Sequence, residues 1–323
     1  MEGIDDLIFE DGEFQASLAR KVLSYLSSRQ RTGYTTSGLY YSYHQADDPK
    51  GLVTIVHGFS EGMYKYREMV YYLVRLGYSC LAYESRGHAR SIRSTDDGSS
   101  VHIDTFETYV EDLRSITEEL AIRMASGRPM HLFGHSMGGC VSALFCQEHP
   151  SYYDSLVLSS PMLGLKVKGP SGALAKGVAD LMCRIGRGEE QVHLGGAKER
   201  FETSASTSRE RWQYYRSVRE DNVLLKMNDP TWSWVRSAIE ASRTAVRNAP
   251  RIGVPVLLLT AQDDSLVDNG MAERFARCNP LVTAVQVPGS RHEIMSSPKA
   301  VLIDYYSRIV SFLDGFRNDV DHP

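Results

Sequence analysis

Cysteine is scarce in this sequence and shows no pattern. Its five cysteines are Cys80, Cys140, Cys146, Cys183 and Cys278. An odd number, wide spacing and the lack of any CxxC pair exclude a disulfide framework and a cysteine-based zinc site. The sequence therefore predicts buried, reduced thiols, as is usual for a protein of the cytoplasm.

Long apolar runs and an excess of positive charge are also missing. No uninterrupted apolar stretch approaches the roughly 18 residues of a membrane span. The first residues, MEGIDDLIFEDGEF, are acidic and do not resemble a secretory signal. A formal net charge of −4 argues against nucleic acid as a partner. We expect a cytoplasmic protein. Peripheral association with a membrane is compatible with this expectation.

What the chain does have is a regular alternation of strand-like and helix-like segments. Such alternation predicts parallel strands joined by helical crossovers, hence an α/β fold with a doubly wound, mostly parallel sheet. Apolar runs predict strands at 36–44, 52–56, 78–84, 130–133, 155–160, 254–261 and 283–288. Helical spacing predicts helices at 66–77 and from 106 onward, and further helices are expected at about 137–148 and 299–314.

The alternation stops between about residues 162 and 249, where several helices are expected in succession. We therefore divide the chain into a first core part (1–161), a helical lid (162–249) and a second core part (250–323). The lid segment holds all three tryptophans and has 15 Lys and Arg against 10 Asp and Glu. The tryptophans fit an apolar slot for an acyl chain, or equally ordinary core packing. The positive charge fits phosphate headgroups or an anionic membrane surface, or equally a solvated helical face.

The stretch GHSMG at 134–138 lies between a predicted strand and a predicted helix. This is the context in which G-x-S-x-G places a serine at a sharp elbow, exposed for nucleophilic attack. Gly134 and Gly138 would remove side chains that collide there, and Gly139 would let the helix pack closely. The competing interpretation of Ser136 is an ordinary serine in a glycine-rich turn.

A serine nucleophile needs a histidine base and a carboxylate that orients it. His292 follows a predicted strand, and it is the best placed of the histidines after Ser136. These are His149, His193, His292 and His322. The carboxylate is expected after the preceding strand, where spacing alone leaves Asp263, Asp264 and Asp268 open. Asp263 and Asp268 fit equally well as solvated loop residues or helix caps.

The negative charge of a tetrahedral intermediate requires backbone donors. The N–H of Met137, directly after the serine, is one candidate. Phe59, in the loop VHGFSEG after an early strand, is the other because Gly58 permits the bend. His57, His88 and His135 are interpreted as histidines that brace these loops.

Five motifs, in order, give the chain a recognisable pattern: HGFSEG, ESRGHARS, GHSMGG, TAQDDSLVD and GSRHEIM. They resemble the α/β-hydrolase-fold serine hydrolases, in particular the branch of bacterial lysophospholipases and monoacylglycerol lipases. The resemblance covers about 30–315. It implies Ser136 as nucleophile, Asp264 as orienting acid, His292 as base, and Phe59 with Met137 as oxyanion hole. The chain departs from many relatives at 84–91, where ESRGHARS replaces Asp-His-Arg-Gly-His-Gly-Arg-Ser.

This resemblance implies hydrolysis of a carboxylic ester through an acyl-serine intermediate, with no metal or organic cofactor. The expected substrate is a small-molecule ester or lysolipid, as for a lysophospholipase or monoacylglycerol lipase. A short-chain ester, aryl-ester or peptide hydrolase of the same fold is the alternative, since fold and triad do not choose the substrate. A non-catalytic, hydrolase-like binding protein would require a broken triad. The sequence carries no prediction of oligomeric state.

Overall fold

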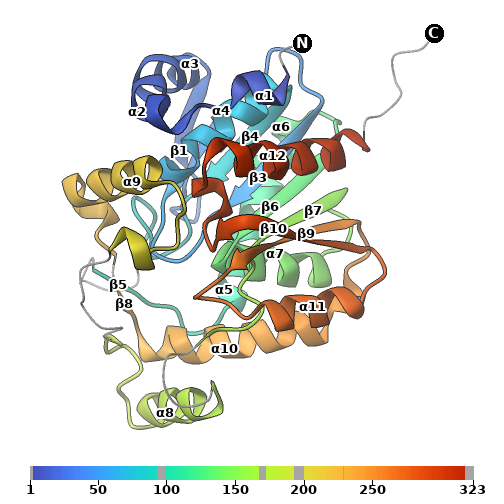
Figure 1. Cartoon of the computed structure of the whole chain (residues 1–323). Coiled ribbons are helices and arrows are strands. Elements are labelled where there is room, and N and C mark those ends of the chain that lie inside the picture. Colours follow the sequence, from blue (N-terminus) through green and yellow to red (C-terminus); the bar gives the residue numbers. More distant parts are fainter. Residues whose placement is uncertain (1–2, 94–98, 167–171, 193–199, 228, 317–323) are drawn as a thin grey trace.

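The computed structural model describes residues 3–93, 99–166, 172–192, 200–227 and 229–316 (Figure 1). Its centre is an eight-stranded sheet in the order β1-β2-β4-β3-β6-β7-β9-β10. The β1–β2 and β2–β4 pairs are antiparallel, and every other neighbouring pair in this sheet is parallel. The α/β class and the doubly wound, mostly parallel sheet predicted from the sequence are therefore confirmed.

The strands of the main sheet are β1 (Gln30–Tyr34), β2 (Tyr40–His44), β3 (Gly51–Val56), β4 (Tyr78–Tyr83), β6 (Met130–His135), β7 (Ser155–Ser159), β9 (Val256–Asp263) and β10 (Val282–Arg291). A separate short pair joins β5 (Ser100–Val101) to β8 (Asp229–Pro230). The α-helices are α1 (Ile4–Leu7), α2 (Phe14–Ser17), α3 (Leu23–Ser27), α4 (Arg67–Arg75), α5 (Glu107–Ile116), α6 (Ile122–Ala125), α7 (Met137–Glu148), α8 (Gly172–Arg184), α9 (Arg209–Asp221), α10 (Trp232–Arg247), α11 (Asn269–Arg277) and α12 (Lys299–Asp314).

Helices cover both faces of the sheet. Between each face and the helices that cover it lies a separate cluster of buried hydrophobic side chains. Strand β3 shows why: Leu52 and Val56 enter one cluster, while Val53 and Ile55 enter the other. Successive side chains of a strand point to opposite faces, so a fully apolar strand feeds both clusters. Helices α4 and α12 cover one face and α5, α7 and α11 the other (Figure 1).

Most predicted elements are confirmed, and the differences have local causes. Helices 137–148 and 299–314 match α7 and α12 at both ends. The strand expected over 36–44 is wrong at its start, because a turn with Gly38 at φ +80° separates β1 from β2. No prediction from the sequence covered β1, β5, β8, the amino-terminal helices or α11.

Helices α8, α9 and α10 follow one another in the chain between β7 and β9, where consecutive helices were expected. Helix α10 packs on both α7 and α8. Trp234 of α10 is buried in the core, with its ring centroid 4.5 Å from that of Phe59. The core-packing interpretation therefore holds for Trp234, while Trp212 of α9 lines the cavity described below.

A fully buried arginine fixes α9 to the rest of the protein. Arg211 makes a two-bonded ion pair with Glu68 of α4, at 2.7 Å and 3.0 Å. Its guanidinium also donates to Asp11 at 2.7 Å and to the Phe9 carbonyl at 3.3 Å. One side chain thus joins α9, α4 and the amino-terminal segment.

We expect Arg211→Met to lower the free energy of unfolding by about 3–5 kcal/mol, because it leaves the Glu68 carboxylate buried without its cation. Urea unfolding measures this loss. Arg209→Met is the matched control on the same helix, since Arg209 pairs with Glu202 at the exposed surface. It should cost less than about 1 kcal/mol. Equal losses for the two variants would contradict the anchoring role of Arg211.

Two expectations from composition, buried reduced cysteines and the lack of a membrane span, can be compared with the structure. All five cysteines are free, and Cys80, Cys140 and Cys146 are buried. The expectation of burial is wrong for Cys278, which is exposed, and only partly met by Cys183. Within the described ranges, no helix combines the length and the apolar character needed to cross a bilayer.

Candidate active site

Ser136 lies at a sharp turn between β6 and α7. Its backbone has φ +52° and ψ −117°, a conformation that L-residues rarely adopt. A Cβ on Gly138 would collide with the Val56 carbonyl, and one on Gly134 would lie 2.6 Å from the Gly138 carbonyl. The glycines therefore make the turn possible, as the motif predicted. The N-terminus of α7, which favours negative charge, begins at the next residue.

Ser136, His292 and Asp264 form one chain of hydrogen bonds. The Ser136 Oγ is 2.9 Å from His292 Nε2, and His292 Nδ1 is 2.7 Å from Asp264 Oδ2. Asp264 follows β9 and His292 follows β10, at the carboxyl ends of neighbouring parallel strands. The structure thus brings together the three side chains that the resemblance assigned to a triad. This geometry suits a nucleophile, a base and an orienting acid.

The three candidate aspartates differ in their surroundings. Asp264 is buried, and its second oxygen accepts the N–H groups of Leu266 and Val267, both at 2.9 Å. Burial alone would raise the pKa of Asp264, but the hydrogen bond to His292 and these amides hold the pKa below its usual value. Asp263 is exposed, and Asp268 caps α11 by accepting the N–H of Gly270.

Of the two expected oxyanion donors, Met137 directly follows the serine and Phe59 lines the same cavity as Ser136. Met137 is the first residue of α7, so its N–H has no acceptor within the helix. His57 controls the other donor: its Nε2 accepts the Ser85 N–H at 2.8 Å, so its Nδ1 carries the proton donated to the Gly58 carbonyl at 2.7 Å. In a trans peptide the N–H points opposite to the carbonyl, so the Phe59 N–H points away from the His57 ring.

His88 and His135 are buried histidines outside the hydrogen-bond chain of Ser136. His88 is fully buried, and burial together with nearby His57 lowers its pKa to about 3. Burial lowers the pKa of His135 to about 4, and its Nδ1 is 3.1 Å from the Ser159 carbonyl oxygen. Both rings are therefore neutral near pH 7. His193 and His322 are outside the described residues.

Ion pairs hold the loop at 84–91, whose sequence differs from that of many relatives. Glu84 pairs with Arg90 at 2.7 Å, and Arg86 pairs with Asp112 at 2.6 Å. The Ser85 N–H braces His57 from the same loop, as described above. The loop thus supports the oxyanion segment from behind and contributes none of the side chains found to line the cavity.

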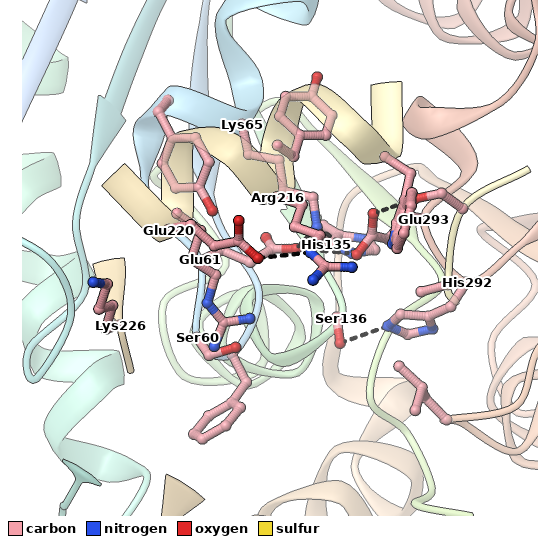
Figure 2. A pocket seen from close by; sticks show the side chains of 18 residues that line it. Ser60, Glu61, Lys65, His135, Ser136, Arg216, Glu220, Lys226, His292 and Glu293 are labelled. Atoms are coloured by element: carbon pink, nitrogen blue, oxygen red, sulfur yellow. Dashed lines mark hydrogen bonds and ion pairs between the residues drawn. The ribbon is translucent and has the colours of Figure 1, made fainter. Parts of the chain in front are cut away.

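Ser136 and His292 open into a cavity of about 590 Å³ (Figure 2). Helix α9 supplies Trp212, Tyr215, Arg216, Arg219 and Glu220 to its wall. Other charged side chains at the cavity are Glu61, Lys65, Lys226 and Glu293. Sequence reasoning missed this charged set, although Glu61 and Glu293 stand inside the quoted motifs HGFSEG and GSRHEIM.

Comparison with known proteins shows the family of the chain. The family model described as serine aminopeptidase, S33, matches residues 47–299. Lysophospholipase L2 of Escherichia coli is 29% identical over 279 residues, which cover 80% of each chain. The monoacylglycerol lipase of Mycolicibacterium smegmatis is 26% identical, over 82% of this chain and 90% of that protein. The solved monoacylglycerol lipase of Paleococcus ferrophilus superposes with a TM-score of 0.70 at 25% identity, over 86% and 99% of the two chains.

The matched family model spans the strands that carry the elbow, Asp264 and His292. The relatives are named as hydrolases of lysophospholipids and of monoacylglycerols, which are both carboxylic esters. The chain therefore belongs to the serine aminopeptidase S33 family of α/β-hydrolases, in its lysophospholipase and monoacylglycerol lipase branch, and is a carboxylic ester hydrolase.

Proposed function

We propose that the protein hydrolyses lysolipid esters through an acyl-serine intermediate. The observation that carries this is the unbroken Ser136–His292–Asp264 hydrogen-bond chain at the wall of a cavity. Ser136 Oγ attacks the ester carbonyl as His292 Nε2 takes its proton. The N–H groups of Phe59 and Met137 stabilise the oxyanion.

The intermediate then collapses as the bond to the alcohol breaks and His292 returns the proton to the leaving oxygen. Water attacks the acyl-serine with His292 again acting as base, which releases the fatty acid and restores Ser136. Asp264 keeps the proton on His292 Nδ1 in the resting enzyme and stabilises the imidazolium. No metal or organic cofactor takes part in these steps.

Among lysolipids, the charges of the cavity favour a substrate with a phosphate. Lys226 lies on the wall formed by α9 and the segment after it, together with Arg219, which donates to the Leu225 and Met227 carbonyls, and Arg216, which pairs with Glu220 at 2.7 Å. Guanidinium and ammonium groups suit a phosphodiester, whereas the uncharged glycerol of a monoacylglycerol needs neither. This favours lysophospholipase activity over monoacylglycerol lipase activity.

The segment 162–249 is proposed as a lid domain inserted between core parts 1–161 and 250–323. Its helix α9 forms one wall of the cavity, and α8 lies on the outer side of α10, at the far end from α12 in Figure 1. The outer helix and the residue that follows it carry an apolar stripe with spacing four, three and four: Leu174, Val178 and Leu181 of α8 and Ile185 directly after it are 40–57% exposed. An exposed stripe of this kind supports transient contact with a membrane surface.

We expect the double variant Leu181→Glu, Ile185→Glu to weaken binding to anionic phospholipid vesicles about tenfold, because it places charge on the apolar stripe. Vesicle co-sedimentation measures this binding. Hydrolysis of a soluble p-nitrophenyl butyrate should be unchanged. Ile122→Glu, on α6, is the control at a similarly exposed position (47%). Unaltered vesicle binding of the double variant would remove α8 from the contact.

The function is tested by a fatty-acid release assay. It presents lysophosphatidylcholine, a monoacylglycerol and short p-nitrophenyl esters to the purified protein side by side. Greatest release from lysophosphatidylcholine is expected. Release from short esters alone would overturn the lipid assignment in favour of a short-chain esterase. Failure of a fluorophosphonate probe to label Ser136 would overturn the mechanism and favour a non-catalytic binding protein.

A further inference from the structure

Lys65 is a buried cation shared by two separate segments of the site. Its Nζ is 2.5 Å from Glu61 Oε1 and 2.6 Å from Glu293 Oε1. The Lys65 side chain is 7% exposed. Glu61 belongs to the loop that carries the Phe59 N–H, and Glu293 directly follows His292. The ammonium group therefore ties the oxyanion loop to the segment of the proposed base (Figure 2).

The other oxygen of Glu61 holds the oxyanion loop itself. Glu61 Oε2 accepts the Gly58 N–H at 2.8 Å and the Tyr66 hydroxyl at 2.7 Å. His57 holds the carbonyl of the same glycine from the other side. Both polar groups of Gly58 are thus fixed, and the peptide plane that carries the Phe59 N–H is fixed with them.

Hydrogen bonds hold both the backbone and the side chain of Glu293. Its N–H donates to the Ala205 carbonyl at 2.9 Å, and its Oε2 accepts the Ser206 hydroxyl at 2.9 Å. When Glu293 is held in place, the adjacent residue His292 has little freedom to shift. The ion pair with Lys65 then sets the separation between this segment and the oxyanion loop.

The charges of this group support a fixed geometry. Burial alone would lower the pKa of Lys65, but Glu293 and Glu61 raise it above its usual value. Burial alone would raise the pKa of Glu61 and of Glu293, but Lys65 holds both below their usual values. All three are therefore charged near pH 7, beside the neutral His135, whose Nε2 is 3.7 Å from Glu61.

Stability is a weak explanation for such an arrangement. Two buried charges, Glu61 and Lys65, and the partly buried Glu293 have a large desolvation cost, and well-packed apolar residues often replace buried ion pairs without loss of stability. Fixing two catalytic segments relative to each other is a stronger explanation, because an error of about 1 Å at a reacting group can cost about a hundredfold in rate.

We propose that Lys65, bridging Glu61 and Glu293, is a positioning residue that sets the oxyanion hole relative to His292. This rests on the proposed acyl-serine mechanism. The same three side chains also line the cavity, so contact with the leaving alcohol is the rival role. The two roles separate kinetically: the oxyanion forms during both acylation and deacylation, whereas the alcohol has departed before deacylation.

The test is pre-steady-state hydrolysis of p-nitrophenyl butyrate by Lys65→Met. Acylation and deacylation constants are both expected to fall about 10–100-fold, with little change in KM. Affinity for an alkyl trifluoromethyl ketone, which forms an oxyanion on Ser136 without a leaving group, should fall by a similar factor. Lys65→Arg, which keeps the positive charge, should recover part of each loss.

Lys176→Met is the matched control, because Lys176 also bridges two carboxylates, those of Asp180 and Glu240, but lies on α8. Its rate constants should equal those of the wild type. If Lys65→Met fails to fold, as judged by circular dichroism, Glu293→Gln weakens the same bridge and should lower both constants to a smaller extent.

A fall in acylation alone would assign Lys65 to the leaving group and overturn the positioning role. Unchanged constants with an unchanged ketone affinity would overturn it as well. Failure of the underlying mechanism is seen separately, because the wild type would then show neither a burst nor fluorophosphonate labelling of Ser136.

Discussion

Replacing Ser136 with alanine is expected to lower kcat for every hydrolysed ester by about 10⁵–10⁶-fold, the loss typical of removing the nucleophile of a serine hydrolase. The reason is the 2.9 Å contact between Ser136 Oγ and His292 Nε2, through which the hydroxyl loses its proton. Without the oxygen no acyl-enzyme forms. Only the catalysis due to binding and to the oxyanion donors remains.

The fold of this variant should survive, because alanine meets the same backbone constraint at φ +52° as serine does. Thermal unfolding should show a midpoint near that of the wild type. Ser126→Ala is a matched control, since Ser126 also has φ +52° but is the C-cap of α6 and does not line the cavity. Full activity in Ser136→Ala, or a large loss in Ser126→Ala, would contradict the assignment of the nucleophile.

Asp264→Asn is expected to lower kcat by about 10⁴-fold, because an amide in this place favours the wrong tautomer of the histidine. Asp264 Oδ2 accepts the proton of His292 Nδ1 at 2.7 Å, and two backbone N–H groups orient its other oxygen. The amide nitrogen would face a donor, so either the ring or the amide must turn. Steady-state kinetics with one soluble ester measures the loss.

The neighbouring Asp263 offers the control. It is one residue away, carries the same charge and is exposed. Asp263→Asn should therefore keep kcat within about twofold, since a solvated carboxylate contributes little to the site. If Asp263→Asn lost activity and Asp264→Asn kept it, the assignment of the acid within TAQDDSLVD would be wrong.

The sequence predicted the central fold well because the parallel strands are buried on both faces. Strands such as β3, β4, β6 and β7 consist of short, nearly continuous apolar runs. The elements missed were those without such a pattern. Strand β1 reads QRTGY and is mostly exposed, so neither alternation nor an apolar run marks it.

For the site, motif order led to the residues of the hydrogen-bond chain, whereas spacing alone did not choose among the aspartates. Only the fold distinguishes a buried Asp264 from an exposed Asp263 and a helix-capping Asp268. The bridge from Glu61 to Glu293 through Lys65 was out of reach of the sequence, because it joins positions more than two hundred residues apart. A charged residue inside a motif does not indicate which distant residue it pairs with in the fold.

The anchor at Arg211 has a consequence for redesign of the enzyme. Because this buried arginine joins α9 to Asp11 and Glu68, the cavity wall is not an interchangeable module. Grafting residues 209–221 onto a relative without the matching acids would strand an unpaired charge in its interior. Conversely, trimming the first eleven residues would loosen a wall of the cavity and alter substrate selectivity, although none of the described residues among them, 3–11, lines the cavity.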